Sequence, residues 1–79
     1  MEQLYHVICT NNIDNATYII TKVLPDDRIK WRLQCDDIGN GLSFNIFECK
    51  RLIELSKQKD RLSGLAGEYT YEIIPAKID

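Results

Sequence analysis

The chain has 79 residues, of which 44% are hydrophobic and 28% are charged, and its formal net charge is −2. This length allows one domain, residues 1–79, with one hydrophobic core, and the composition is that of a globular rather than a disordered protein. The slightly acidic balance excludes the strongly cationic class of nucleic-acid-binding proteins.

The three cysteines are odd in number and widely spaced, which is untypical of a secreted domain held by disulfides. The first residues lack the basic and apolar regions of a signal peptide. No apolar run approaches the roughly 20 residues that a membrane-spanning helix needs. We therefore expect a reduced, cytoplasmic protein that does not enter a membrane.

The first part of the chain predicts strands. Residues 4–10 carry apolar side chains on both alternating faces, which is typical of a central strand, and residues 11–15 are rich in turn formers. Residues 16–23 are ambiguous. Their β-branched and aromatic side chains favour a strand, whereas apolar positions three and four apart also fit a helix capped by Asp14. We prefer the strand.

The clearest pattern lies at residues 29–35, between a Pro-Asp-Asp turn and an Asn40-Gly41 turn signal. Polar residues there alternate with Ile29, Trp31, Leu33 and Cys35. This period of two predicts a strand with one buried and one exposed face. A short strand at residues 42–44 is also expected.

An amphipathic helix is predicted from Asn45, which is a good N-cap, with Glu48 placed to complete a capping box and with Phe44 and Cys49 at the staple positions. Its apolar stripe, which should face the sheet, contains Ile46, Cys49, Leu52, Ile53 and Ser56. A glycine-containing loop follows at residues 63–67. Residues 68–75 form the last predicted strand, and its proline marks a strand end or a sheet edge.

These elements predict an α+β fold: an antiparallel sheet of about four strands with one helix on one face, in the order β-β-β-α-β. The alternative is a ferredoxin-like β-α-β-β-α-β domain. That alternative requires residues 13–24 to be helical and residues 42–46 to form a true strand.

The sequence contains no catalytic or metal-binding motif. His6 and Cys9 are three apart on a strand, so their side chains point to opposite faces and cannot share an ion. Cys49 lies on the apolar stripe, where a small core side chain is expected. The aspartate pairs at 26–27 and 36–37 are interpreted as turn caps. We therefore expect no catalytic residue, metal or cofactor.

Two surfaces of the helix are candidate binding sites. Phe47 and Leu55 lie off the apolar stripe, and with the adjacent Arg51 and Lys50 they form a candidate partner-binding site. The sequence leaves open that segment 61–67 covers them with Leu62 and Leu65. A candidate phosphate-binding set on the same helix consists of Lys50, Arg51, Lys57 and Lys59. Acidic residues interrupt this set, as on an ordinary solvated helix face.

Four features occur together: the opening YHVICTN segment, a strand with Trp31, Phe44 just before a helix, and the closing YEIIP segment. With these features the chain resembles small, mostly uncharacterised proteins encoded by bacteriophages and prophages. The resemblance covers most of the chain. The chain departs from that class at Cys49, where an alanine is usual. The resemblance implies a cytoplasmic accessory role in the host cell, often inhibition of a host or defence protein by direct binding, and transfers no catalytic residues.

The leading hypothesis is therefore a non-enzymatic protein-binding module with a protein partner of unknown identity. The alternative is nucleic-acid or nucleotide binding through the basic helix face. A small cysteine-dependent enzyme ranks last, and a homodimer is compatible with each of these hypotheses.

Overall fold

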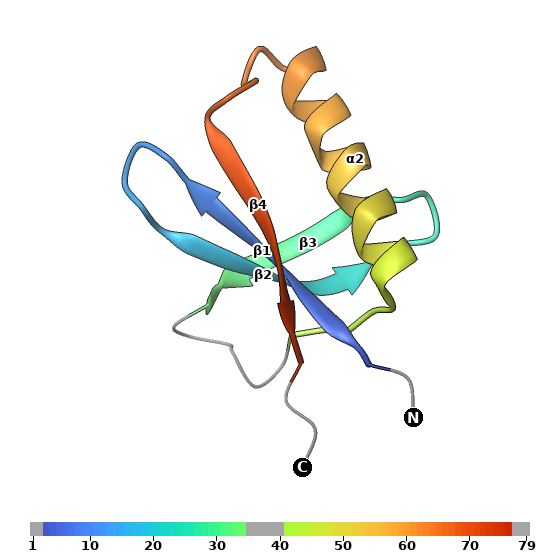
Figure 1. The fold of residues 1–79 in the computed structure, drawn as a ribbon. Coiled ribbons are helices and arrows are strands. Elements are labelled where there is room, and N and C mark those ends of the chain that lie inside the picture. Colours follow the sequence, from blue (N-terminus) through green and yellow to red (C-terminus); the bar gives the residue numbers. More distant parts are fainter. Residues whose placement is uncertain (1–2, 35–40, 77–79) are drawn as a thin grey trace.

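The computed structural model describes residues 3–34 and 41–76. In these ranges one antiparallel sheet in the order β3-β2-β1-β4 packs against one long helix. The elements are β1 (Tyr5–Asn11), β2 (Thr17–Val23), β3 (Ile29–Leu33), α2 (Ile46–Leu62) and β4 (Tyr69–Pro75). The protein therefore has the predicted α+β fold in the order β-β-β-α-β (Figure 1).

The ambiguous segment is a strand, which excludes the ferredoxin-like alternative. β2 pairs with β1 on one side and with β3 on the other, with Ile19 opposite Ile8 and Ile20 opposite Trp31. The consecutive residues Ile19 and Ile20 are both almost completely buried. A strand buries neighbouring residues on its two faces, whereas a helix on a sheet buries residues three or four apart.

Most predicted boundaries agree with the structure to within a residue. The predicted short strand at residues 42–44 is a single bridge, in which Tyr5 and Phe44 exchange backbone hydrogen bonds of 2.8 Å. β4 lies at the edge of the sheet and ends at Pro75, as the proline predicts. Four residues to which the sequence assigns a strand end or turn lie outside the described ranges: Cys35, Asp36, Asp37 and Asn40.

The hydrophobic core lies between the sheet and α2, and its buried centre consists of Val7, Ile20, Cys49 and Leu52. Ile8 and Ile19 are buried on the opposite face of the sheet. The segment after Gly41 lies against that face, where the Leu42 N–H donates to the Ile20 carbonyl at 2.8 Å. Both sheet faces are therefore covered, which explains the apolar residues on both sides of β1.

The start of α2 is fixed as its sequence predicts, with one difference. The Asn45 side chain accepts a 2.8 Å hydrogen bond from the Glu48 N–H, so Asn45 is the N-cap. The Glu48 carboxylate binds the Arg51 guanidinium rather than completing the capping box. Ion pairing with a cation one turn along the helix therefore replaces the expected return bond.

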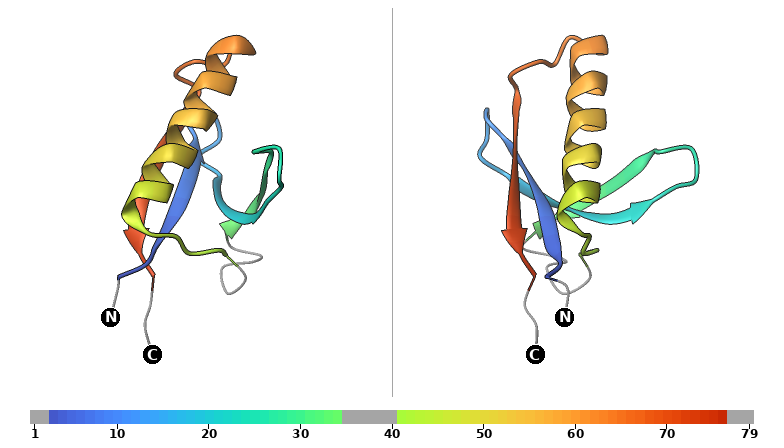
Figure 2. Two further views of the ribbon diagram at one scale, coloured as in Figure 1. Left: turned by 90° about the vertical axis from the view of Figure 1, so that its right-hand side faces the viewer. Right: turned by 45° about the vertical axis from the view of Figure 1, so that its right-hand side comes forward.

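The contact between helix and sheet is closest along the first two thirds of α2. The buried helix residues are Cys49, Leu52 and Ser56, and none lies in the last turn. Figure 2 shows the twisted sheet from two sides: β1 and β4 run beside the helix, and the β2–β3 hairpin, which projects to one side in the left-hand view, crosses the N-terminal half of the helix in the right-hand view. In the described residues no helix is both long and apolar enough to cross a membrane.

Candidate functional site

The predicted partner-binding pair is only partly exposed. Phe47 is 79% exposed, so segment 61–67 does not cover it. Leu55 is half-buried and packs against the core cluster, so it does not share an exposed apolar patch with Phe47. Leu55 is three residues from the buried Leu52, and this spacing places both on the same side of the helix.

Arg51 connects the helix to the β2–β3 turn. Its guanidinium binds Glu48 and also binds Asp27 through Nη1 and Oδ1 at 3.2 Å. The two carboxylates raise the pKa of Arg51, and its hydrogen bond lowers the pKa of Glu48. Because two carboxylates neutralise this cation, it is poorly suited to the phosphate-binding role that its place in the basic run predicted.

The remaining predicted phosphate ligands do not form one strip. Lys50, Lys57 and Lys59 are exposed; Lys50 and Lys57, seven residues apart, share one side of the helix, whereas Lys59 lies about 200° around the axis from Lys57. Lys57 and Lys59 accordingly line two different hollows. The structure therefore does not bring together the four basic side chains that the sequence grouped.

A cavity of about 290 Å³ lies between the sheet and the C-terminal end of α2. We call it the aromatic pocket. All four strands contribute to it, together with the last turns of the helix and the loop that follows. Its lining residues are Cys9, Tyr18, Trp31, Asp60, Leu65, Tyr69 and Tyr71.

The strand register brings these side chains together. Cys9 of β1 pairs directly with Tyr18 of β2 and with Tyr71 of β4, so the three form a row across the sheet. Tyr69 lies two residues from Tyr71 and therefore on the same face. The Trp31 and Tyr71 rings are tilted by 44° with their centroids 6.1 Å apart, an arrangement typical of aromatic pairs.

A hydrogen bond between the sheet and the helix crosses the site. The Tyr71 hydroxyl donates to Asp60 Oδ2 at 2.5 Å. Burial, followed by this bond, raises the pKa of Tyr71. Burial and the nearby Asp60 charge raise the pKa of the Cys9 thiol to about 11. Among the described residues lining the aromatic pocket, Asp60 is the one acidic side chain.

The end of the helix places Leu65 in the pocket wall. The Leu65 N–H donates to the Asp60 carbonyl at 2.7 Å and the Gly64 N–H donates to the Arg61 carbonyl, which is the Schellman pattern. Gly64 has φ 73°, a left-handed conformation that glycine adopts without strain. The chain therefore reverses directly after Asp60 and returns over the pocket.

Two further hollows adjoin the aromatic pocket, and both include Asp60 and Tyr71 in their linings. One, of about 100 Å³, also contains Ile29, Ser56 and Lys59. The other, of about 280 Å³, also contains Lys57, Arg61 and Gly67. The Tyr71–Asp60 bond therefore stands where the three cavities meet.

The sequence did not predict this pocket. It predicted a strand over residues 68–75, and the acidic residues near the basic run were interpreted only as interruptions of that run. One local signal was available, because a carboxylate in the last turn of a helix opposes the helix macrodipole. Such a local conflict is common at functional sites.

In the described ranges no group of three or more His, Cys, Asp or Glu side chains could hold a metal ion. Comparison of the chain with protein-family models, with curated proteins and with solved structures finds no significant match. Function must therefore be argued from the chemistry of the pocket.

Proposed function

We propose that the protein is a non-enzymatic protein-binding module that holds its partner through the aromatic pocket. The observation that carries the proposal is the convergence of one tryptophan and three tyrosines on a half-exposed cavity. Tryptophan and tyrosine dominate the residues that contribute most to protein–protein binding, and such residues gather in well-packed pockets.

The size of the pocket supports a protein ligand. Pockets for small molecules and cofactors usually occupy about 300–1,000 Å³, and this one lies at the lower end with about 290 Å³. A cavity of this size suits one anchoring side chain. The two hollows beside it offer room for neighbouring residues of the same partner.

The chemistry of Cys9 supports binding over catalysis. A cysteine acts as a nucleophile through its thiolate, which a lowered pKa favours. Burial instead raises the pKa of Cys9 to about 11, so its thiol is protonated at neutral pH. The pocket therefore offers apolar and aromatic contact area rather than an activated nucleophile.

Binding without chemistry fits the role that the resemblance to phage accessory proteins implies. In this proposal the protein acts in the host cytoplasm and inhibits a host or defence protein by covering part of its surface. The bound partner loses function because its own site is occluded.

The test is capture of a partner from bacterial lysate by the tagged protein, compared with two variants. Tyr69→Ala opens one wall of the aromatic pocket, and Tyr69 is not among the residues packed on the core cluster. Phe47→Ala removes an equally aromatic but 79% exposed side chain outside the pocket. We expect the native chain and Phe47→Ala to retain one stoichiometric protein that Tyr69→Ala loses.

The opposite pattern would contradict the pocket assignment. Loss of the protein with Phe47→Ala but not with Tyr69→Ala would place the site on the outer face of the helix. Recovery of nucleic acid alone would instead favour the basic helix face.

A further inference from the structure

We infer that the aromatic pocket receives the guanidinium group of an arginine side chain of the partner protein. This inference rests on the proposed function and specifies what the pocket recognises. It follows from the charge, the ring faces and the hydrogen-bonding capacity of the lining residues.

The charge of the pocket favours a cation. The ordinary pKa values of cysteine and tyrosine lie above neutral pH, and burial raises those of Cys9 and Tyr71 further. Asp60 is the one acidic side chain among the described lining residues. An anionic group in this cavity would face that carboxylate without a compensating cation in the described lining.

The aromatic rings add to the same preference. The faces of tryptophan and tyrosine rings carry negative electrostatic potential, and a cation within about 6 Å of a ring centroid is attracted to it. Trp31, Tyr18, Tyr69 and Tyr71 all line the one cavity. Arginine is found in such contacts more often than lysine, because its flat guanidinium also stacks on the ring.

Asp60 is held in position to accept further hydrogen bonds. Its Oδ2 accepts from the Tyr71 hydroxyl, which fixes the carboxylate against the sheet. An ionised carboxylate has about four acceptor sites, so capacity remains for the N–H groups of a guanidinium. The planar arrangement of those N–H groups matches a carboxylate better than the ammonium of lysine does.

Neighbouring cations limit how much positive charge can bind. Lys59 and Lys57 line the two adjoining hollows rather than the aromatic pocket. Arg61 lines the larger of these hollows and lies 3.7 Å from the Glu54 carboxylate. A single basic side chain therefore suits the pocket better than a run of several.

The experiment uses two probes whose termini are blocked and uncharged, N-acetyl-arginine amide and N-acetyl-citrulline amide. They differ at one group: the arginine probe carries a charged guanidinium where the citrulline probe carries a neutral urea. Trp31 is the only tryptophan in the sequence, so its indole N–H signal in NMR reports on the pocket without ambiguity. We expect the arginine probe to shift this signal and to bind about tenfold more tightly than the citrulline probe, the scale of one charge-assisted hydrogen bond.

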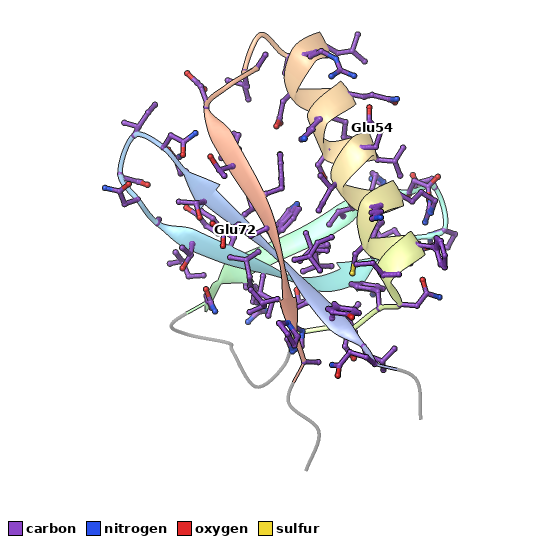
Figure 3. All side chains as sticks on the ribbon, in the orientation of Figure 1. Glu54 and Glu72 are labelled. Atoms are coloured by element: carbon purple, nitrogen blue, oxygen red, sulfur yellow. The ribbon has the colours of Figure 1, made fainter. Side chains whose placement is uncertain are left out.

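Three further variants separate the effect of the Asp60 charge from an effect on the fold. Asp60→Asn keeps an oxygen that can accept from Tyr71 but removes the charge, and should weaken the arginine probe about tenfold while leaving the citrulline probe unchanged. Glu54→Gln removes the same charge from an exposed position on the same helix and should change neither probe (Figure 3). Glu72→Gln, beside Tyr71 but on the opposite sheet face, is the matching control on β4.

Equal affinity for the two probes in the native protein would overturn the inference, and so would an Asp60→Asn variant that binds arginine as well as the native chain. If capture of a partner still depended on Tyr69, the proposed function would stand while the arginine assignment failed. If the pocket selected arginine but no capture depended on Tyr69, the proposed function would fail instead.

Discussion

At the scale of single residues, Cys9 links the core to the aromatic pocket. Its side chain is 6% exposed and pairs in the sheet with Tyr71. Desolvation and the nearby Asp60 charge both disfavour the thiolate, which raises the pKa of Cys9 from 9.0 to about 11. The fold therefore keeps the Cys9 thiol protonated beside the Asp60 carboxylate, and this preference lowers the stability of the folded protein at high pH.

We predict that the protein loses stability as the pH rises from 9 to about 11. In this window the unfolded chain has lost the Cys9 proton while the folded chain retains it, so rising pH favours unfolding. The shift corresponds to a loss of roughly 2 kcal/mol at its upper end. Tyr71 and Cys49, whose pKa values are also raised, act in the same direction.

Urea unfolding measured across this pH range would test the prediction, with Cys9→Ala as the comparison. The variant should start from a lower stability because it leaves a small cavity. Its free energy of unfolding should then decline less steeply with pH than that of the native protein. Identical slopes for the two proteins would show that Cys9 does not contribute.

At the scale of elements, the two ends of α2 are fixed in different ways. Its N-terminus is attached by the Asn45 cap and by Arg51, which reaches Asp27 in the β2–β3 turn. Its C-terminal part is attached by the Tyr71–Asp60 hydrogen bond. The buried residues Cys49, Leu52 and Ser56 therefore fill the interface along the first two thirds of the helix, and the aromatic pocket lies at its C-terminal end.

The far face of the sheet depends on a close approach at Gly41. A Cβ atom added there would lie 2.2 Å from Ile19 Cδ1 and 2.7 Å from Cγ1. Ile19 is 1% exposed, so the close packing around it resists a shift of its side chain. We predict that Gly41→Ala lowers the free energy of unfolding by about 1–3 kcal/mol, as overpacking of a core does.

A double-mutant cycle measured by urea unfolding identifies the cause of this loss. Ile19→Val removes Cδ1 and should recover part of the effect of Gly41→Ala, which makes the two changes non-additive. Gly67→Ala provides the control: its φ of 86° strains an alanine, but no atom lies within 4 Å of the added Cβ. Additive energies for Gly41 and Ile19 would contradict the steric explanation.

The sequence could predict the secondary-structure elements of this protein but not its pocket. Alternation, the Asn45 cap and the apolar stripe are local patterns, and they were sufficient for the strands, the helix and the fold class. The aromatic pocket requires Cys9 to pair with Tyr71, a contact between the first and last strands. No local pattern specifies that register, so the residues of the site could be assigned to strands but not to one another.

At the scale of the whole molecule, positive and negative charges nearly balance, and the basic side chains of the helix point in different directions. The net charge is −2, two carboxylates bind Arg51, and Arg61 lies near Glu54. Lys57 and Lys59 face different hollows. Affinity for a nucleic-acid backbone grows with the number of phosphates neutralised together. On the side of α2 that carries Lys50, Lys57 and Arg61, the Glu54 carboxylate lies among the cations, 3.7 Å from Arg61, and offsets part of their charge.

We therefore predict weak binding to nucleic acid, with a Kd above about 10⁻⁴ M for single-stranded DNA even at low salt. Fluorescence anisotropy with a labelled oligonucleotide at increasing salt concentration would measure it, with the variant Lys50→Gln/Lys57→Gln/Lys59→Gln as the control. Because few phosphates are engaged, the triple variant should bind much as the native chain does. Tight binding that falls steeply with salt, and that the triple variant loses, would mean that the basic helix face rather than the aromatic pocket is the binding surface.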